Sequence, residues 1–175
     1  VMASRGSVIP RFVEQIKAGH PLTVTEPSMT RFIMSLEEAV ELVLFAFENA
    51  ESGDIMVQKA PACTIGVLAQ AVKELFKSNA ETQIIGIRHG EKMYETLLTK
   101  EESANALDMG NFFRVPCDKR DLNYEKYFEQ GTKEISPIKE FNSESTNLLD
   151  IEEVKQKLLS LKYIQDELSV IENRK

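Results

Sequence analysis

Three short stretches of the sequence each place an arginine in a setting that could bind an anionic group. In the first, Arg5 and Gly6 come directly before a predicted helix, whose free N-terminal amides favour a negative charge. In the second, Arg31 begins a short predicted strand among apolar residues, where a partly shielded guanidinium favours a bidentate anion. Each also has an ordinary explanation: a surface arginine beside a helix cap for Arg5, or an ion pair for Arg31.

The third stretch, Gly86–Lys92, follows a predicted strand and contains both an arginine and a glutamate. Ligand sites in α/β proteins gather at the C-terminal ends of strands, so the position favours a binding site. Arg88 could bind a phosphate, while Glu91 could accept two hydrogen bonds from a diol such as that of a ribose. A salt bridge between the two at a helix end is the alternative.

Catalytic machinery is not visible in the chain. No acid–base or nucleophile pattern stands out, and no Gly-rich loop follows a predicted strand, as a dinucleotide site requires. Cys63 and Cys117 lie far apart without metal-ligand spacing, and we expect free thiols in a reducing compartment. We therefore expect no catalytic and no metal-binding residues here.

Charge and hydropathy argue against two classes of protein, general nucleic-acid binders and membrane-spanning proteins. The formal net charge of −7 argues against a general nucleic-acid binder. The longest apolar run, residues 39–47, is interrupted by Glu41 and is too short to cross a bilayer. No signal peptide is visible, so a soluble cytoplasmic protein without a membrane segment is expected. Because residue 1 is Val, we also expect the chain to be part of something longer.

Periodicity and capping signals indicate how these stretches are positioned. Helices are expected over residues 8–18, 35–49 and 64–76, and strands over 21–26, 31–34, 54–59 and 82–87. Strands alternating with helices indicate an α/β fold. The helix at 35–49 is nearly all apolar behind a Ser35–Glu38 capping box, which predicts deep burial.

The C-terminal part has weaker periodicity, with a second capping box at Thr99–Glu102 opening a short helix and a strand expected over 112–116. A last helix begins at Asp150, which forms a further capping box with Glu153. Its apolar residues form a narrow seam suited to packing on a neighbour, in the same chain or in another subunit: Ile151, Val154, Leu158, Leu161 and Leu168.

Five ordered motifs together resemble one family. They are Val1–Pro10 (VMASRGSVIP), Met29–Phe32 (MTRF), Asp54–Pro61 (DIMVQKAP), Arg88–Lys92 (RHGEK) with Tyr94-Glu95, and Arg120–Tyr124 (RDLNY). The sequence resembles the polysaccharide-biosynthesis branch of the extended short-chain dehydrogenases. Within it, the chain looks most similar to UDP-N-acetylglucosamine 4,6-dehydratases, and the capsular UDP-sugar 4-epimerases share much of the pattern.

This resemblance implies a fold and a domain organisation. The expected fold class is α/β, the C-terminal substrate-binding part of an extended short-chain dehydrogenase Rossmann-like fold, with the N-terminal dinucleotide-binding part absent. Residues 1–110 would form the nucleotide-sugar-binding part. Residues 111–175 would form the C-terminal extension of the polysaccharide-biosynthesis branch, with its terminal helix.

The resemblance also implies residue roles. Arg31 and Arg88 would bind the substrate diphosphate, and Glu91 would accept the ribose hydroxyls. Thr25 would lie against the uridine, and Val8 would contact the nucleotide. To these we add Arg5 as a substrate-binding residue beside the first helix, and the resemblance places Val1 near the nicotinamide cofactor.

By resemblance, the parent enzyme would act on a UDP-sugar in bacterial surface polysaccharide (capsule or O-antigen) biosynthesis, with NADP or NAD as cofactor. The chain alone would bind no cofactor and would be inactive without the missing N-terminal Rossmann half. The parent is expected to be a homo-oligomer.

Three hypotheses remain open. The first is half of a 4,6-dehydratase, a lyase, with half of a 4-epimerase, an isomerase acting on UDP-glucose or UDP-N-acetylglucosamine, as its near alternative. The second is a non-enzymatic UDP-sugar-binding module from a truncated gene. The third is a purely structural remnant that binds nothing and aggregates through exposed apolar surface.

Overall fold

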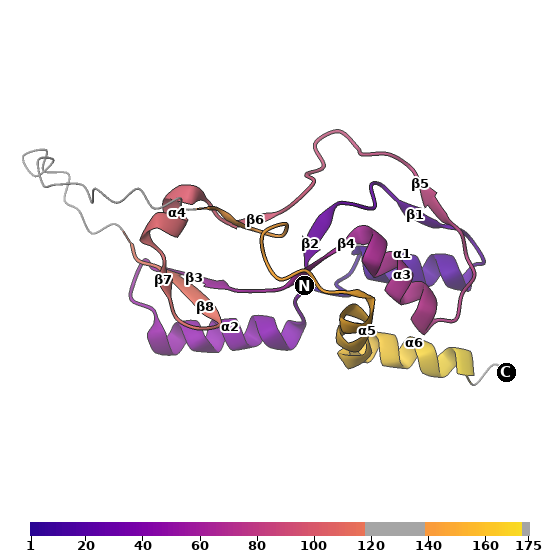
Figure 1. Ribbon diagram of the computed structural model, residues 1–175. Coiled ribbons are helices and arrows are strands. Elements are labelled where there is room, and N and C mark those ends of the chain that lie inside the picture. Colours follow the sequence, from indigo (N-terminus) through magenta and orange to yellow (C-terminus); the bar gives the residue numbers. More distant parts are fainter. Residues whose placement is uncertain (118–138, 173–175) are drawn as a thin grey trace, which may run out of the picture. The chain divides into compact units, whose positions relative to one another are not determined.

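The computed structural model describes residues 1–117 and 139–172 (Figure 1). The motif Arg120–Tyr124 therefore lies outside the described residues. The chain divides into two compact units, each built from separated segments. The first comprises Val1–Ala39, Ala60–Glu95 and Ser143–Lys175, and the second comprises Val40–Lys59 and Thr96–Asn142. The predicted boundary between residues 110 and 111 stays a prediction.

The first unit mixes helices with short strands. Its elements are α1 (Val8–Lys17), β1 (Leu22–Val24), β2 (Thr30–Phe32), β4 (Ala62–Thr64), α3 (Ile65–Leu75), β5 (Thr82–Ile84), α5 (Ile151–Ser160) and α6 (Lys162–Glu172). β1 and β5 run parallel, with Leu22 opposite Thr82. β2 and β4 are antiparallel, with Arg31 opposite Cys63.

The core of the first unit lies between its helices. Phe12 and Val13 of α1 pack with Leu68 of α3 and with Val154 and Leu158 of α5 in one buried cluster. Spacing of three or four residues puts the apolar side chains of each helix on one face, and burial of that face stabilises the helix. The core therefore depends on helices from both ends of the sequence.

The predicted last helix is two helices with a break between them. Leu161 has an extended ψ of 123°, which ends α5 and redirects the chain into α6. The bend is visible where α5 meets α6 in Figure 1. The predicted seam packs within this chain, because Val154, Leu158 and Leu161 are all buried in the core of the first unit.

The second unit is built on a small antiparallel sheet. Its elements are most of α2 (Leu36–Asn49), with β3 (Ile55–Gln58), β6 (Thr96–Leu98), α4 (Lys100–Asn105), β7 (Leu107–Asp108), β8 (Phe112–Val115) and β9 (Phe141–Asn142). The strand order in its sheet is β3-β8-β7, and β6 pairs with β9. Arg114 of β8 binds Asp54 (Nε–Oδ2 2.5 Å) and Glu51 (Nη2–Oε1 3.0 Å), which fixes the start of β3.

The prediction that the helix at 35–49 is deeply buried was wrong for this structure. None of the residues of α2 is buried, and the side chain of Phe47 is 83% exposed. One side of the helix packs in the second unit, where the ring of Phe45 stacks on that of Phe112 with centroids 4.2 Å apart. The apolar residues on its other side contact nothing that covers them among the described residues.

No helix within the described ranges is both long and apolar enough to cross a membrane. The observed architecture is mixed α/β, as predicted.

Candidate functional site

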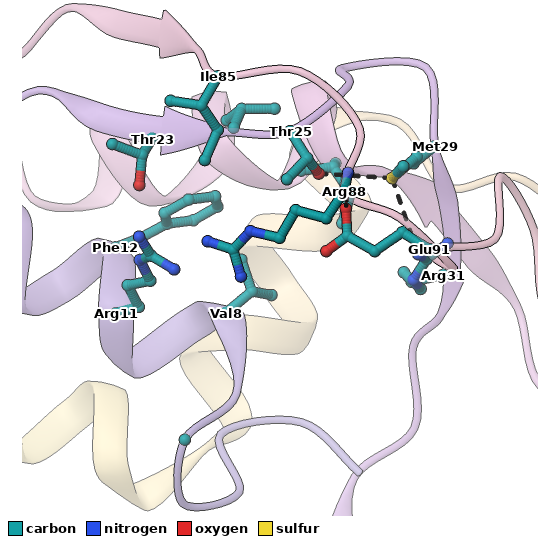
Figure 2. A pocket seen from close by; sticks show the side chains of 13 residues that line it. Val8, Arg11, Phe12, Thr23, Thr25, Met29, Arg31, Ile85, Arg88 and Glu91 are labelled. Carbon is teal, nitrogen blue, oxygen red and sulfur yellow. Dashed lines mark hydrogen bonds between the residues drawn. The ribbon is translucent and has the colours of Figure 1, made fainter.

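The first unit contains a pocket of about 340 Å³. A volume of this size suits a small-molecule ligand. Helix α1, the end of β1 and the segment after β5 all contribute side chains to it (Figure 2). The lining residues are Gly6, Val8, Arg11, Phe12, Thr23, Val24, Thr25, Met29, Arg31, Ile65, Ile85, Arg88 and Glu91.

The parallel pairing of β1 and β5 explains why separated stretches meet here. The C-terminal ends of parallel neighbours lie at the same edge of a sheet. Beyond the paired residues, the amide of Ile85 still donates to the carbonyl of Val24 (2.8 Å). Gly86 then turns the chain with a φ of +81°, a conformation that glycine adopts without strain. Arg88 is thereby brought to the pocket beside Thr25.

Arg88 and Glu91 form a tight turn at the edge of the pocket. The amide of Arg88 donates to Oε2 of Glu91 (3.1 Å), and the amide of Glu91 donates to the carbonyl of Arg88 (3.1 Å). Among the described residues, the guanidinium of Arg88 has no hydrogen-bond or ion-pair partner. The structure therefore does not contain the alternative, a salt bridge between the side chains of Arg88 and Glu91. Figure 2 shows the arginine side chain reaching across the pocket toward Val8 and Arg11.

Arg11 is a pocket residue that the sequence analysis missed. Its guanidinium likewise has no hydrogen-bond or ion-pair partner in the part of the chain that the structure describes, and it lines the same pocket as Arg88. Two unpaired guanidiniums in one pocket make it electropositive in a chain of net charge −7. The sequence could have indicated this residue, because Arg11 follows Val8 by three positions and therefore lies on the same helix face.

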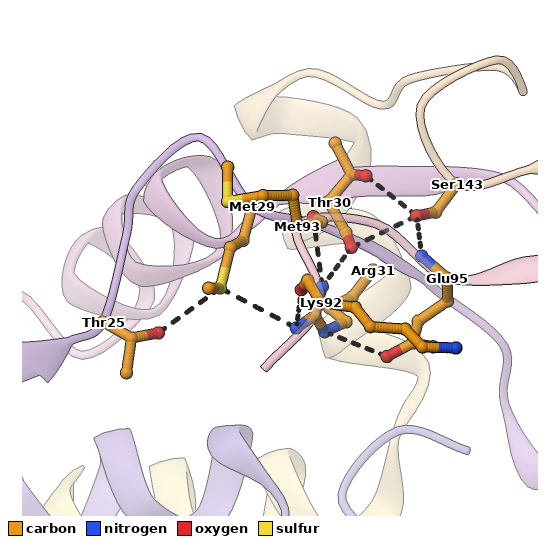
Figure 3. Close-up of polar contacts among 8 residues, drawn as sticks. All are labelled: Thr25, Met29, Thr30, Arg31, Lys92, Met93, Glu95 and Ser143. Carbon is orange, nitrogen blue, oxygen red and sulfur yellow. Dashed lines mark hydrogen bonds and ion pairs between the residues drawn. The ribbon is translucent and has the colours of Figure 1, made fainter. Parts of the chain in front are cut away.

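Arg31 also lines the pocket, but its guanidinium is hydrogen-bonded to backbone carbonyls. Nη1 donates to the carbonyls of Thr30 (2.7 Å) and Met93 (3.3 Å), and Nη2 donates to that of Lys92 (2.8 Å). Nε lies 3.8 Å from Oε1 of Glu95, a loose ion pair. The arginine thus ties β2 to the segment just after Glu91 (Figure 3).

A buried polar cluster anchors the same segment further along. The hydroxyls of Thr30 and Ser143 lie 2.8 Å apart, and the Ser143 hydroxyl accepts the amide proton of Glu95 (2.9 Å). The amide of Ser143 donates in turn to the carbonyl of Glu95 (2.8 Å). Ser143 is fully buried, so each of these polar atoms needs its protein partner (Figure 3).

The predicted site residues fall into two groups. Val8, Thr25, Arg31, Arg88 and Glu91 all line the pocket. Arg5 and Val1 do not line it, and both are exposed. Gly6 lines it in place of Arg5, because the chain turns there with a φ of +78° before α1 begins.

Neither cysteine contributes reactive chemistry to the pocket. Cys63 and Cys117 are free, and burial raises the pKa of the Cys63 thiol to about 12, which keeps it protonated. Within the described ranges, no group of three or more His, Cys, Asp or Glu side chains is placed to hold a metal ion. The pocket offers arginines, one carboxylate and hydroxyls, which suit the binding of an anionic, hydroxyl-bearing ligand.

The sequence profile described as "Polysaccharide biosynthesis protein" matches residues 1–117. The chain belongs to this family. A second profile, described as "Polysaccharide biosynthesis protein C-terminal", matches residues 118–165. The predicted membership of the polysaccharide-biosynthesis branch is therefore confirmed.

Curated relatives carry the name "UDP-glucose 4-epimerase". The protein from Rickettsia felis is 57% identical over 168 residues, which is 96% of this chain and 49% of the relative. The protein from Rickettsia akari is 56% identical over the same length. The chain thus spans about half the length of the curated relatives it matches.

A solved structure supports the fold of this family member. The X-ray structure of Pen from Bacillus thuringiensis matches 92% of this chain and 46% of its own, with a TM-score of 0.72 and 32% sequence identity. The predicted fold class is therefore confirmed: the chain is an α/β part of a larger Rossmann-like fold.

Proposed function

We propose that the pocket binds the nucleotide diphosphate of a UDP-sugar, and that the chain is the substrate-binding half of a UDP-sugar-modifying enzyme of bacterial surface polysaccharide biosynthesis. The observation that carries the proposal is the placement of Arg88 and Glu91 at one pocket, with the guanidinium unpaired among the described residues and pointing inward. The family and the name of the Rickettsia relatives support the same substrate class.

Five of the lining residues have a proposed task. Arg88 binds the diphosphate as a bidentate donor, and Arg31 adds positive charge at the same wall. Glu91 accepts the two ribose hydroxyls with its carboxylate. Thr25 and Val8 contact the uridine from opposite sides, at the end of β1 and the start of α1.

Two reactions are supported for the complete protein. The ordered sequence motifs favour 4,6-dehydration of UDP-N-acetylglucosamine, whereas the printed name of the relatives favours 4-epimerisation. Enzymes of both kinds act on the same class of substrate and would bind its diphosphate in the same way. The pocket residues bind and orient the sugar nucleotide in either case.

The cofactor of this family is NAD(P), which exchanges a hydride with the sugar when bound. The described residues do not fit a dinucleotide site of their own: the sequence has no Gly-rich strand–turn–helix, and Val1 is exposed and outside the pocket. We propose that the cofactor is bound by the part of a full-length relative that the 168 matched residues do not cover, and that this chain alone has no turnover.

The location proposed for the chain is the cytoplasm. The two free thiols, Cys63 and Cys117, suit a reducing compartment.

Calorimetric titration of the 175-residue chain with UDP and with UDP-N-acetylglucosamine tests the site. The substitution Arg88→Ala is expected to weaken binding about 10- to 100-fold, because it removes a charge-assisted contact. Lys100→Ala is the matched control, since it removes one exposed positive charge on α4, outside the pocket. Equal affinity of Arg88→Ala and wild type for UDP would show that the site is wrongly assigned.

Adding the half of the enzyme that this chain does not match would distinguish 4-epimerisation from 4,6-dehydration. The chain is co-expressed with the segment of the Rickettsia felis relative outside the matched residues, and the purified mixture receives NAD(P) and a UDP-sugar. Nuclear magnetic resonance then separates a product inverted at C4 from a 4-keto-6-deoxy product. UDP binding by the chain without turnover in this mixture would favour the non-enzymatic binding module.

A further inference from the structure

Helix α2 carries an apolar surface that nothing covers among the described residues. Val40, Val43, Leu44 and Phe47 have exposed fractions of 50%, 52%, 57% and 83%. Spacings of three and four residues put these side chains on one face of the helix, which we call the α2 stripe. Contiguous exposed apolar surface of this kind marks an interaction site in a folded protein.

The opposite face of the same helix is already packed. Phe45 stacks on the ring of Phe112 in β8 at 4.2 Å with an interplanar angle of 18°. Because each residue of a helix turns by about 100°, Phe45 lies roughly opposite the stripe. A helix at the outer surface of a protein has one apolar face, whereas a helix that is apolar on two faces lies between two layers. The α2 stripe therefore needs a second layer.

We propose that the α2 stripe is the docking surface for the other half of a full-length family member, the segment that the 168 matched residues of the Rickettsia relatives do not cover. That segment is the partner whether it is joined to this chain or made as a separate polypeptide. This chain matches only 49% of those relatives, so about half of their length is available to form the partner.

Strand β3 supports an α/β partner of this kind. β3 pairs with β8 on one side, and no strand of the described residues pairs with its other edge. Ile55 on this strand is also 52% exposed. An open strand edge in the same unit as a bare apolar helix face offers a partner both a strand to pair with and a layer to pack on.

A second copy of the chain fits the stripe less well. The sequence of α2 contains four glutamates (Glu37, Glu38, Glu41 and Glu48) and no Lys or Arg. Glu38 is ion-paired with Lys157, but Glu37, Glu41 and Glu48 flank the stripe. Two copies of α2 packed face to face would bring these three carboxylates together, and like charges across an interface oppose association.

The proposal is independent of the proposed function, because no residue of the α2 stripe lines the pocket. Substitutions in the stripe are therefore expected to leave UDP affinity unchanged, while substitutions at Arg88 leave docking unchanged. Failure of one proposal would not be confused with failure of the other.

Co-expression tests the docking surface directly. The 175-residue chain is produced with a tagged segment of the Rickettsia felis relative, the part outside the matched residues, and the two are expected to co-purify. The substitutions Val43→Asp and Phe47→Glu are each expected to weaken the complex at least about 30-fold, as for a central apolar contact. Glu41→Gln, an exposed residue of the same helix, is the matched control and is expected to stay within about 2-fold of wild type.

Controls for folding and for other occupants complete the test. Each variant should keep the circular dichroism spectrum and the UDP affinity of the wild type, since the substituted side chains are exposed. Hydrogen exchange of residues 40–47 should slow in the complex relative to the chain alone. Failure of the wild-type chain to co-purify, unchanged binding by Phe47→Glu, or self-association of the chain that Phe47→Glu abolishes would each overturn the proposal.

Discussion

The hydroxyl of Ser143 lies 2.8 Å from the hydroxyl of Thr30, although 113 residues separate them in the sequence. The same serine oxygen lies 3.2 Å from the carbonyl oxygen of Thr30 and accepts the amide proton of Glu95. The late part of the chain therefore holds the segment that presents Arg88 and Glu91. This anchoring connects the buried polar cluster to the proposed ligand site.

Replacing Ser143 should weaken both the fold and the pocket. Ser143→Ala leaves the Glu95 amide and the Thr30 hydroxyl buried without this partner, which costs about 1–3 kcal/mol of unfolding free energy. Urea unfolding measures that loss, and UDP titration should show weaker binding because the segment of residues 88–95 is held less firmly. Ser169→Ala, an exposed serine on α6, serves as the control and should change stability by less than about 0.5 kcal/mol. Equal stability of the two variants would contradict the anchoring role.

Lysine substitution should separate the roles of Arg31 and Arg88, two of the three arginines that line the pocket. Arg31 donates to three backbone carbonyls, a geometry that a lysine ammonium cannot reproduce. Arg31→Lys should therefore lose about as much UDP affinity as Arg31→Ala. Arg88→Lys should keep more affinity than Arg88→Ala, because an ammonium still attracts a phosphate as a point charge. Calorimetry at one salt concentration, applied to the four variants, tests this difference between the two positions. If lysine preserved affinity better at position 31 than at position 88, the positioning role of Arg31 would be refuted.

Acid should destabilise the second unit through Asp54. The amide of Glu51 donates to its carboxylate (2.8 Å), and with the Cys117 amide and the Arg114 guanidinium it lowers the pKa of Asp54 below its ordinary value. A lowered folded-state pKa stabilises the protein above the ordinary aspartate pKa of 3.8, and this stabilisation is lost as pH falls through the lower folded-state value.

The check is urea unfolding at a series of pH values. Asp54→Asn should be less stable than wild type near neutral pH, and the difference should shrink below the ordinary aspartate pKa. Asp166→Asn, an exposed residue on α6, is the comparison and should follow the wild-type curve. A constant difference between Asp54→Asn and wild type at every pH would show that the carboxylate charge is not the cause.

Features set by neighbouring residues could be predicted from the sequence. The capping boxes at Thr99–Glu102 and at Asp150–Glu153 form as expected, because each needs only two hydrogen bonds across one helical turn. The clustering of Arg88 and Glu91 was also predictable, since both belong to one turn after a strand. Their roles in binding stay predictions.

Features set by distant contacts could not be predicted in this way. The apolar pattern of α2 led to a prediction of deep burial, because the pattern does not say whether the residues that cover a helix face belong to this chain. The break at Leu161 follows from packing in the core of the first unit rather than from a Gly or Pro signal. Likewise, no periodicity marks Ser143 as the partner of Thr30, because that contact exists only after the chain has folded.

The first unit cannot close its core until a late part of the chain has been synthesised. Val154, Leu158 and Ile164 are fully buried in the same cluster as Phe12, and the whole second unit is inserted between them in the sequence. Translation proceeds at about 5–20 residues per second, so α1 leaves the ribosome well before its packing partners exist. The nascent chain therefore exposes the apolar face of α1 for seconds, and we expect chaperones to bind it during that interval. Slow codons between residues 95 and 143 would prolong that exposure and lower the yield of folded protein.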